Sequence, residues 1–302
     1  MSNENKAQRY IHPDWVMLGE CTRKEIRQAL ERGDLQAAII PIGATEQHNE
    51  HLALSYDIFM STFIAQQAAL KIYPLATVAP GSPVGYSPYH MARKGTLTLR
   101  KETLQAYIYD VARSLRTHGI RTVLVVNGHG GNHGLLKEVL PQWRRELDLT
   151  LDEVSYWTGM SDEMRADILQ GYRDLRDGKL DTVARQSALN HASEEESALM
   201  LAAYPQRVRS FTMEEYDAEN LDYAYDLTEQ VREYLELFSK EGWPEAGPNP
   251  ENPRDRARQE NALLATAEKG ARLATFHAQF VADLVRQMVE ATQRGAAWPL
   301  EE

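Results

Sequence analysis

Cysteine is nearly absent from this chain of 302 residues: Cys21 is the only one, which excludes any internal disulfide bond. No apolar run approaches the roughly 18 residues needed to cross a membrane. The polar N-terminal stretch MSNENKAQRYIHPDW also lacks the apolar core and cleavage site of a signal peptide. We therefore expect a soluble protein in the cytoplasm, a compartment that keeps thiols reduced.

Basic stretches are also missing, and the formal net charge is −11. Nucleic acids and anionic membranes are bound through a positively charged face, so neither is an expected partner. The composition, 43% hydrophobic and 25% charged, is that of an ordinary globular protein. We expect one domain over residues 1–302 that acts on a small molecule.

Short apolar runs alternate with amphipathic segments through the first half of the chain. The expected strands are 37–42, 75–79, 121–126 and 149–157. The expected helices are 22–32, 58–72, 101–118 and 135–147, followed by a charged, helix-prone stretch at 161–180 and later helices at 197–203 and 261–294. Strands separated by helices indicate βαβ units, and therefore a layered α/β fold with a mostly parallel sheet.

Residues 214–253 interrupt this alternation with acidic and aromatic residues, ending in WPEAGPNPENP, which regular helix does not accommodate. We interpret the stretch as an irregular excursion from the core. It has two equally favoured readings: a lid or subunit contact, and a surface loop with no role.

Possible metal ligands gather in residues 41–57, directly after the first strand: Glu46, His48, Glu50, His51 and Asp57. Imidazole and carboxylate are the usual donors for zinc, manganese or iron. Glu46 and His48 point to the same side of an extended chain. Asp57 lies far enough along to return from a loop, where its two oxygens could bridge two ions. The alternative is a polar loop with surface histidines.

A glycine-rich turn, VVNGHGGNHG at 125–134, follows the third expected strand. Its glycines allow positive φ angles and a close approach of the backbone to a ligand, so we expect Gly130 to contact the substrate. The turn matches neither of the common phosphate-binding motifs. His129, at its apex, is better explained as a metal ligand, whereas His133 is expected to be a supporting or structural residue.

The acidic run Glu194, Glu195 and Glu196 begins another expected helix, where the helix dipole alone would favour carboxylates. One of the three could instead turn inward as a further ligand, and His191 could act as an acid or base. These residues do not themselves identify which glutamate it is. Together the three segments predict a hydrolytic site with one or two metal ions.

At these motifs the chain resembles the creatininase (creatinine amidohydrolase) family, over roughly residues 18–205 and again near the C-terminus. The resemblance lies in three motifs in the right order: PIG with EQH and Asp57, then NGHGGN, then HASE with ES before the helix ALML. It implies a three-layer α/β/α sandwich with a mostly parallel sheet, two divalent metal ions (Zn, Mn or Fe) and a homo-oligomer, usually a hexamer.

The resemblance also implies roles for single residues. Glu46 and His129 bind one ion, His48 binds the other, and Asp57 bridges them. Its further implied roles are Glu196 as the remaining metal ligand, His191 in proton transfer, and Trp157 in stacking on the substrate. A tryptophan packed in the core at a strand end is the alternative for Trp157.

The chain also departs from the family pattern. Creatininase has a further acidic residue where this chain has Gly131, and family members commonly have Gly and Pro where this chain has Asn49 and Ala53. An element that often reads Phe-Pro-Gly-Thr is RKGT at 93–96. Arg93 and Lys94 either place positive charge near an anionic or polyhydroxylated substrate or are solvated surface charges. These differences argue against creatinine itself as the substrate.

The expected activity is hydrolysis of an amide-type C–N bond in a small cyclic substrate through a metal-bound hydroxide. The alternative keeps the same site but cleaves a carbon–carbon bond in a cyclic polyol ketone such as a keto-inositol. A third reading, of another class, is a metal-stabilised binding protein without catalytic activity.

Overall fold

Four parallel strands form the central sheet, in the order β2-β1-β3-β4. The computed structural model describes residues 12–182, 185–186, 188–218, 228–239 and 253–299. The strands are β1 (Ala37–Ile42), β2 (Ala76–Val78), β3 (Thr122–Asn127) and β4 (Thr150–Ser155). All four expected strands are confirmed: β1 has the expected ends, and the ends of the other three are shifted by one or two residues.

The two central strands are fully buried, as their unbroken apolar sequences predict. Successive side chains of β1 enter opposite layers: Ile39 joins one core cluster, while Ala38 and Ile40 join the other. The register pairs Ile42 with Asn127, so β1 and β3 end side by side. Ligand sites of open α/β sheets lie beyond these carboxyl ends.

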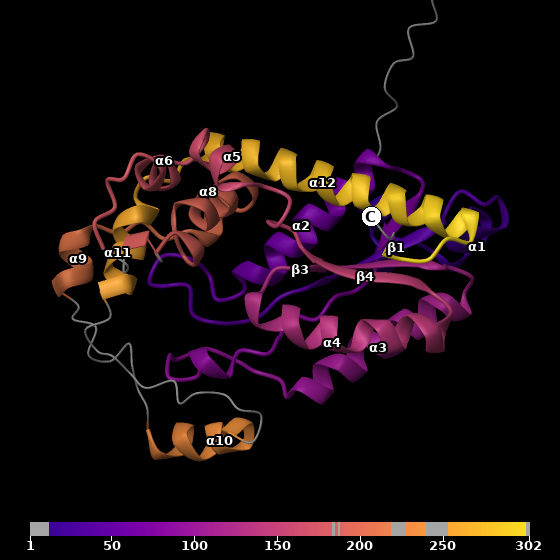
Figure 1. Ribbon diagram of the computed structural model, residues 1–302, viewed down its shortest axis with the longest axis horizontal. Coiled ribbons are helices and arrows are strands. Elements are labelled where there is room, and N and C mark those ends of the chain that lie inside the picture. The colour runs from indigo at the N-terminus through magenta and orange to yellow at the C-terminus, as the bar shows by residue number, and fades with distance from the viewer. Residues whose placement is uncertain (1–11, 183–184, 187, 219–227, 240–252, 300–302) are drawn as a thin grey trace, which may run out of the picture.

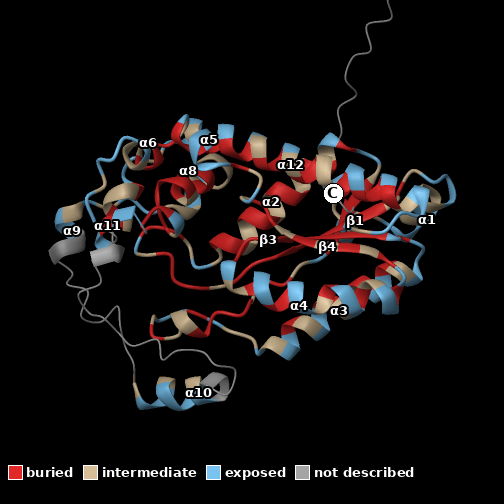
Figure 2. Ribbon diagram, in the orientation of Figure 1, coloured by how far each residue is buried: buried red, intermediate tan, exposed pale blue. Residues whose placement is uncertain are grey.

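Helices cover both faces of the sheet, which confirms the three-layer α/β/α arrangement (Figure 1). On one face lie α2 (Tyr56–Lys71) and the long α12 (Ala267–Arg294); on the other lie α3 (Lys101–Thr117) and α4 (Gly130–Leu147). Buried residues concentrate in the strands and on the inward sides of these helices (Figure 2). None of the described helices is long and apolar enough to span a bilayer.

The remaining helical segments that can be delimited within the described residues are shorter. They are η1 (Pro13–Val16), η2 (Leu18–Glu20), α1 (Arg23–Glu31), η3 (Pro88–His90), α5 (Asp162–Ala166), α6 (Gln170–Arg176), η4 (Ala188–Asn190), α8 (Glu194–Ala203), η5 (Pro205–Arg207), α9 (Met213–Ala218), α10 (Glu229–Ser239) and α11 (Pro253–Ala262).

Several helix boundaries differ from expectation in ways that matter for the site. Asp57 lies in the first turn of α2, not in a loop. α4 begins at Gly130, directly after His129, and continues through Pro141. The expected final helix is in fact two, α11 and α12, and Thr266 caps α12. Apolar spacing misses these helix starts because their first turns carry polar residues or glycine.

The excursion at 214–253 is less irregular than expected, because its described part contains most of α9 and the whole of α10. Tyr234 of α10 donates a hydrogen bond to the Thr98 carbonyl (3.3 Å). Residues 219–227 and 240–252, which include most of the proline-rich end, lie outside the described residues.

Candidate metal centre

Glu46 and His48 lie on the segment that leaves the carboxyl end of β1, and both are buried. The Glu46 N–H donates to the Leu54 carbonyl (2.9 Å), which folds the segment back on itself. Nδ1 of His48 lies 3.2 Å from the Glu46 carbonyl oxygen. This nitrogen therefore carries the proton, and Nε2 is left with the lone pair that a metal ligand needs.

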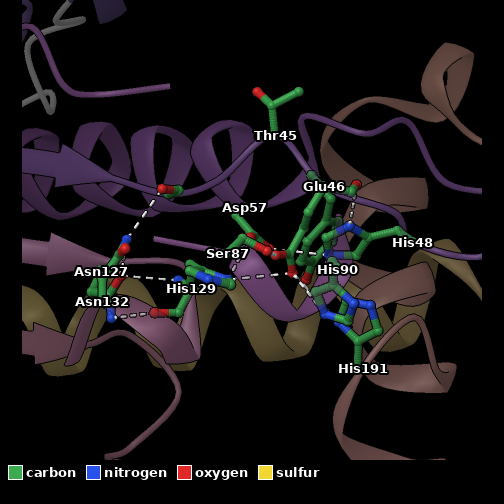
Figure 3. A network of polar contacts seen from close by, with 12 residues as sticks. Thr45, Glu46, His48, Asp57, Ser87, His90, Asn127, His129, Asn132 and His191 are labelled. Carbon is green, nitrogen blue, oxygen red and sulfur yellow. Dashed lines mark hydrogen bonds and ion pairs between the residues drawn. The ribbon is translucent and has the colours of Figure 1, made fainter. Parts of the chain in front are cut away.

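Asp57 stands between two histidines (Figure 3). Its Oδ1 lies 3.1 Å from Nε2 of His48, and its Oδ2 lies 3.2 Å from Nδ1 of His129. Each carboxylate oxygen thus faces a different imidazole. This is the arrangement needed for a carboxylate shared by two metal ions.

His129 is the N-cap residue of α4, directly after β3. Its Nε2 lies 3.0 Å from the Tyr86 carbonyl oxygen, so it donates there, and Nδ1 is 3.3 Å from Oε1 of Glu46. The Asn127 side chain accepts the His129 backbone N–H (2.9 Å), which holds the turn. As in His48, a carbonyl fixes the tautomer and the other nitrogen points inward.

Glu196 completes the group from the first turn of α8. Its Oε2 lies 3.6 Å from Nε2 of His48 and accepts the Ala192 N–H (2.6 Å). Burial raises the pKa of the Glu196 carboxyl to about 7. We call Glu46, His48, Asp57, His129 and Glu196 the metal cluster.

The other two glutamates of the acidic run have cationic partners elsewhere. Glu194 pairs with Lys269 (2.6 Å), and Glu195 pairs with Arg165 (2.9 Å). The geometry therefore distinguishes Glu196 from its neighbours, which the acidic run alone could not do.

The metal cluster fits divalent cations. Nε2 of His48 and Oδ2 of Asp57 are buried and make no hydrogen bond of acceptable geometry within the described part of the chain. Burial lowers the pKa of His48, but the neighbouring Asp57 and Glu196 carboxylates raise it more, to about 9. Donor atoms of Glu46, His48 and Asp57 lie within 4.8 Å of one another. Such nitrogen and oxygen donors suit zinc, manganese or iron.

His191 lies beside the metal cluster, with its ring 4.4 Å from that of His48 and its Nδ1 4.0 Å from Oε1 of Glu46. Its Nε2 is 2.9 Å from the Gln47 carbonyl oxygen. Donor atoms of His48, His191 and Glu196 also lie within 4.8 Å of one another, so the position suits proton transfer or metal ligation.

His90 is a site residue that the sequence did not reveal. Its ring stacks on His191 (centroids 5.1 Å apart, planes at 15°), and its Nε2 lies 3.6 Å from Oε1 of Glu46. The Gln47 side-chain amide lies 3.2 Å from Nδ1 of His90. His90 follows neither a strand nor a glycine turn, so no sequence signal separates it from a surface histidine.

Three polar candidates lie elsewhere. Glu50 is exposed. His51 is buried but contacts Ser197 (2.7 Å), outside the metal cluster. His133 is half-exposed and pairs with Glu153 (2.8 Å).

The glycine-rich turn works differently from expectation, because none of its glycines has a positive φ angle. Two of them, Gly128 and Gly131, are needed for close packing instead. A Cβ on Gly128 would lie 2.2 Å from the Asp57 carbonyl oxygen, and one on Gly131 only 2.4 Å from that of Tyr86. The Tyr89 hydroxyl would lie 2.5 Å from the same Gly131 Cβ, so an acidic side chain at position 131 has no room.

A cavity of about 710 Å³ opens beside the metal cluster, a volume suited to a small molecule. Gly130, Trp157 and His191, the expected substrate-contacting and catalytic residues, all line it. Gly130 is exposed, with no atom of another residue within 4 Å of a Cβ built there. Trp157 is half-buried and packs edge-on against Tyr156.

Comparisons with known proteins give one consistent answer. The family model described as "Creatinine amidohydrolase" matches residues 19–288. The creatinine amidohydrolase of Pseudomonas putida is 28% identical over 283 residues, covering 90% of this chain and 96% of that protein. The 3-dehydro-scyllo-inosose hydrolase of Thermotoga maritima is 36% identical over 119 residues, covering 39% of this chain and 37% of that protein.

A solved structure of similar fold is a glutamate-to-glutamine mutant creatininase of Zn-Zn type. It superposes with a TM-score of 0.62 at 24% identity and covers 90% of this chain and 97% of that chain. At that identity the likeness establishes the shared fold.

Proposed function

This chain belongs to the creatininase family of hydrolases, and on that premise we propose that it hydrolyses an amide-type C–N bond in a small cyclic substrate, using two divalent metal ions. The observation that carries the proposal is the position of Asp57. Each of its oxygens faces a ring nitrogen of a different buried histidine, 3.1 Å from Nε2 of His48 and 3.2 Å from Nδ1 of His129. The Zn-Zn form of the similar structure supports a two-ion site.

Glu46 and His129 would hold one ion, His48 and Glu196 the other, and Asp57 would bridge the two. When bound, the ions supply an activated water molecule and polarise the carbonyl of the substrate. The carbonyls that accept from His48 Nδ1 and His129 Nε2 fix both rings in the ligand tautomer. Close packing at Gly128 holds β3 and the first turn of α2 together, which keeps Asp57 in place.

His191 would pass a proton to the leaving nitrogen as the C–N bond breaks. His191 lines the cavity, and its Nε2 lies 2.9 Å from the Gln47 carbonyl oxygen, which fixes the orientation of the ring. Gly130 and Trp157 would form the substrate-contacting walls: the glycine leaves space for the ring, and the indole offers a flat surface.

The second candidate function keeps this site but cleaves a carbon–carbon bond in a cyclic polyol ketone. The 36% identity to the inosose hydrolase favours it, although that match spans 39% of this chain. The larger coverage of the creatinine amidohydrolase, 90% of this chain, favours C–N cleavage.

The test is product analysis by NMR with the metal-loaded protein, using five- and six-membered lactams in one set and a keto-inositol in the other. Opening a lactam releases one carboxylate and one amine, whereas C–C hydrolysis releases a carboxylate without an amine. Asp57→Asn should abolish the reaction, and Glu50→Gln, a change at an exposed residue of the same segment, should leave it intact. Full turnover in Asp57→Asn would refute the two-ion site.

We also propose a homohexamer located in the cytoplasm. The test of assembly is the solution mass, with about six times the 34.3 kDa of one chain expected from light scattering.

A further inference from the structure

His51 is a buried histidine that belongs neither to the metal cluster nor to the cavity lining. Its Nε2 lies 2.7 Å from the Ser197 hydroxyl oxygen, and the side-chain amide nitrogen of Gln259 lies 3.1 Å from its Nδ1. The exposed fractions of His51, Ser197 and Gln259 are 1%, 1% and 0%. We call these three residues the buried tether.

A serine, a histidine and an amide in this order can form a hydrolytic nucleophile, its base and the group that orients the base. Such a nucleophile has to reach the substrate. None of the three side chains lines the cavity of about 710 Å³, and all three are almost fully buried. The buried tether therefore has no direct access to a substrate, and its contacts within the protein define its role.

Two hydrogen bonds fix the ring of His51. The Gln259 amide donates to Nδ1, so Nε2 carries the ring proton and donates to the Ser197 hydroxyl oxygen. The backbone is held as well, because the His51 carbonyl accepts the Arg209 N–H (2.7 Å). Gln259 lies on α11, which packs against α8 (Figure 1). His51 is thus a fixed point to which α8 is attached through Ser197.

The bond between His51 and Ser197 joins two segments that each carry a metal ligand. His51 follows His48 by three residues, across a turn in which Asn49 has a φ of 53°. Ser197 directly follows Glu196 on α8. Nε2 of His48 and Oε2 of Glu196 lie 3.6 Å apart, as two ligands of the same ion would. The buried tether therefore spans the gap between the segments that hold a single ion.

The ligands of the other ion are held without this contact. Glu46 and His129 follow the neighbouring strands β1 and β3, and the Gly128 N–H joins these strand ends by donating to the Ile42 carbonyl (2.8 Å). Neither ligand lies on α8 or α11. A change in the buried tether should therefore act on one ion and spare the other.

We propose that His51 is a positioning residue: through Ser197 it sets the distance between His48 and Glu196, and so raises the affinity for the ion that these two ligands share. This inference rests on the two-ion site of the proposed function. Partners that orient metal ligands from outside the coordination shell contribute about 10- to 100-fold in metal affinity. Loss of the buried tether should weaken the binding of one ion by about that factor and leave the affinity for the other nearly unchanged.

Manganese titrations by calorimetry on the metal-free full chain, with metal content measured after dialysis, test the proposal. The unmodified chain should bind two ions. Ser197→Ala and His51→Leu should each weaken one of the two by about 10- to 100-fold. His51→Gln, which keeps an N–H donor, should restore most of that affinity. The double variant should lose no more than either single variant, because both changes remove the same bond.

Two further variants separate a positioning role from a structural one. In Glu196→Gln a ligand of the weakened ion is already altered, so adding His51→Leu should change the affinity for the remaining ion little. Thr77→Val removes a buried hydroxyl of β2 that donates to the Val16 carbonyl of η1 (3.0 Å). This control should lower the melting temperature while both ions keep their affinities.

Equal weakening of both ions in Ser197→Ala and His51→Leu would overturn the proposal, as would unchanged affinities for both ions. The two substitutions lie on separate segments, so a folding defect in one variant leaves the other as a test. Binding of fewer than two ions by the unmodified chain would refute the two-ion site and the positioning role together. Two ions that both keep their affinity in the variants would refute the positioning role alone.

Discussion

The metal cluster and the basic wall, as we call the cavity-lining residues His90, Arg93, His191 and Arg258, border one cavity but are built in different ways. The members of the metal cluster follow β1 or β3, or lie in the first turns of α2 and α8. The basic wall comes from η3 and the loop after it, the residue after η4, and α11. Strand ends and first helical turns thus hold the metal cluster, whereas connecting segments and α11 supply the basic wall.

The sharpest way to test this division is to remove the shared carboxylate of the metal cluster. In Asp57→Asn we expect metal affinity to fall more than about 100-fold, because even outer-shell partners of metal ligands contribute 10- to 100-fold. Turnover should fall by at least about 10⁴-fold, since enzymatic accelerations exceed roughly 10⁶-fold and the ions supply much of it. Metal analysis and steady-state kinetics give the two values. Loss of turnover with both ions retained would contradict this explanation.

His191→Ala tests whether His191 transfers a proton or binds a metal ion. If His191 transfers a proton, turnover should fall by about 10²- to 10⁴-fold while two ions per chain remain bound. Its donor atoms also lie within 4.8 Å of those of His48 and Glu196. Loss of one ion in His191→Ala would therefore make His191 a ligand and move it into the metal cluster. His133→Ala, at a half-exposed histidine paired with Glu153, is the matched control.

The pH dependence should separate the metal-free protein from the metal-loaded one. In the metal-free protein the pKa of His48 is about 9, above its ordinary 6.5. A raised pKa contributes stability that is complete below pH 6.5 and is lost as the pH rises through 9. Metal binding instead requires neutral imidazole and releases protons, so apparent affinity should rise on the order of tenfold per pH unit for each proton released.

Melting temperatures measured with and without manganese, from below pH 6.5 to above pH 9, check these two pH dependences. The metal-free protein should lose stability as the pH rises, while the stabilisation by manganese should grow. Parallel curves with and without manganese would contradict the protonated state of His48. His48→Gln removes the titrating group and should flatten the metal-free curve.

Much of the fold and of the metal cluster could be predicted from the sequence, because both depend on local signals. Unbroken apolar runs define β1 and β3, and Glu46, His48 and His129 follow them closely along the chain. The position of Asp57 depends on where α2 begins, and polar first-turn residues hide that start. Glu196 could be separated from Glu194 and Glu195 only by the family resemblance, since the pairing of Glu194 with Lys269 is a long-range contact.

The basic wall could be predicted only in part, because its residues meet through tertiary packing. His90 is brought to Glu46 by the short helix η3, and Gln47 contacts it through a side-chain amide. Arg258 reaches the cavity because α11 packs against α8 and η4. No periodicity or spacing in one sequence encodes such contacts. The sequence offers Arg93 and Lys94 alike, either as charges near the substrate or as solvated surface charges, and does not separate one residue from the other.

The smallest effect is expected where the cavity wall is aromatic. Trp157 is half-buried, lines the cavity and packs edge-on against Tyr156 (5.0 Å, 87°). If it stacks on the substrate, Trp157→Phe should raise KM by about fivefold, equivalent to about 1 kcal/mol of aromatic contact, and leave metal content and melting temperature nearly unchanged. Trp143→Phe, on the buried face of α4, should do the reverse and lower the melting temperature without changing KM. A fall in stability with unchanged KM in Trp157→Phe would assign that ring to the core and confine substrate contacts to the basic wall and Gly130.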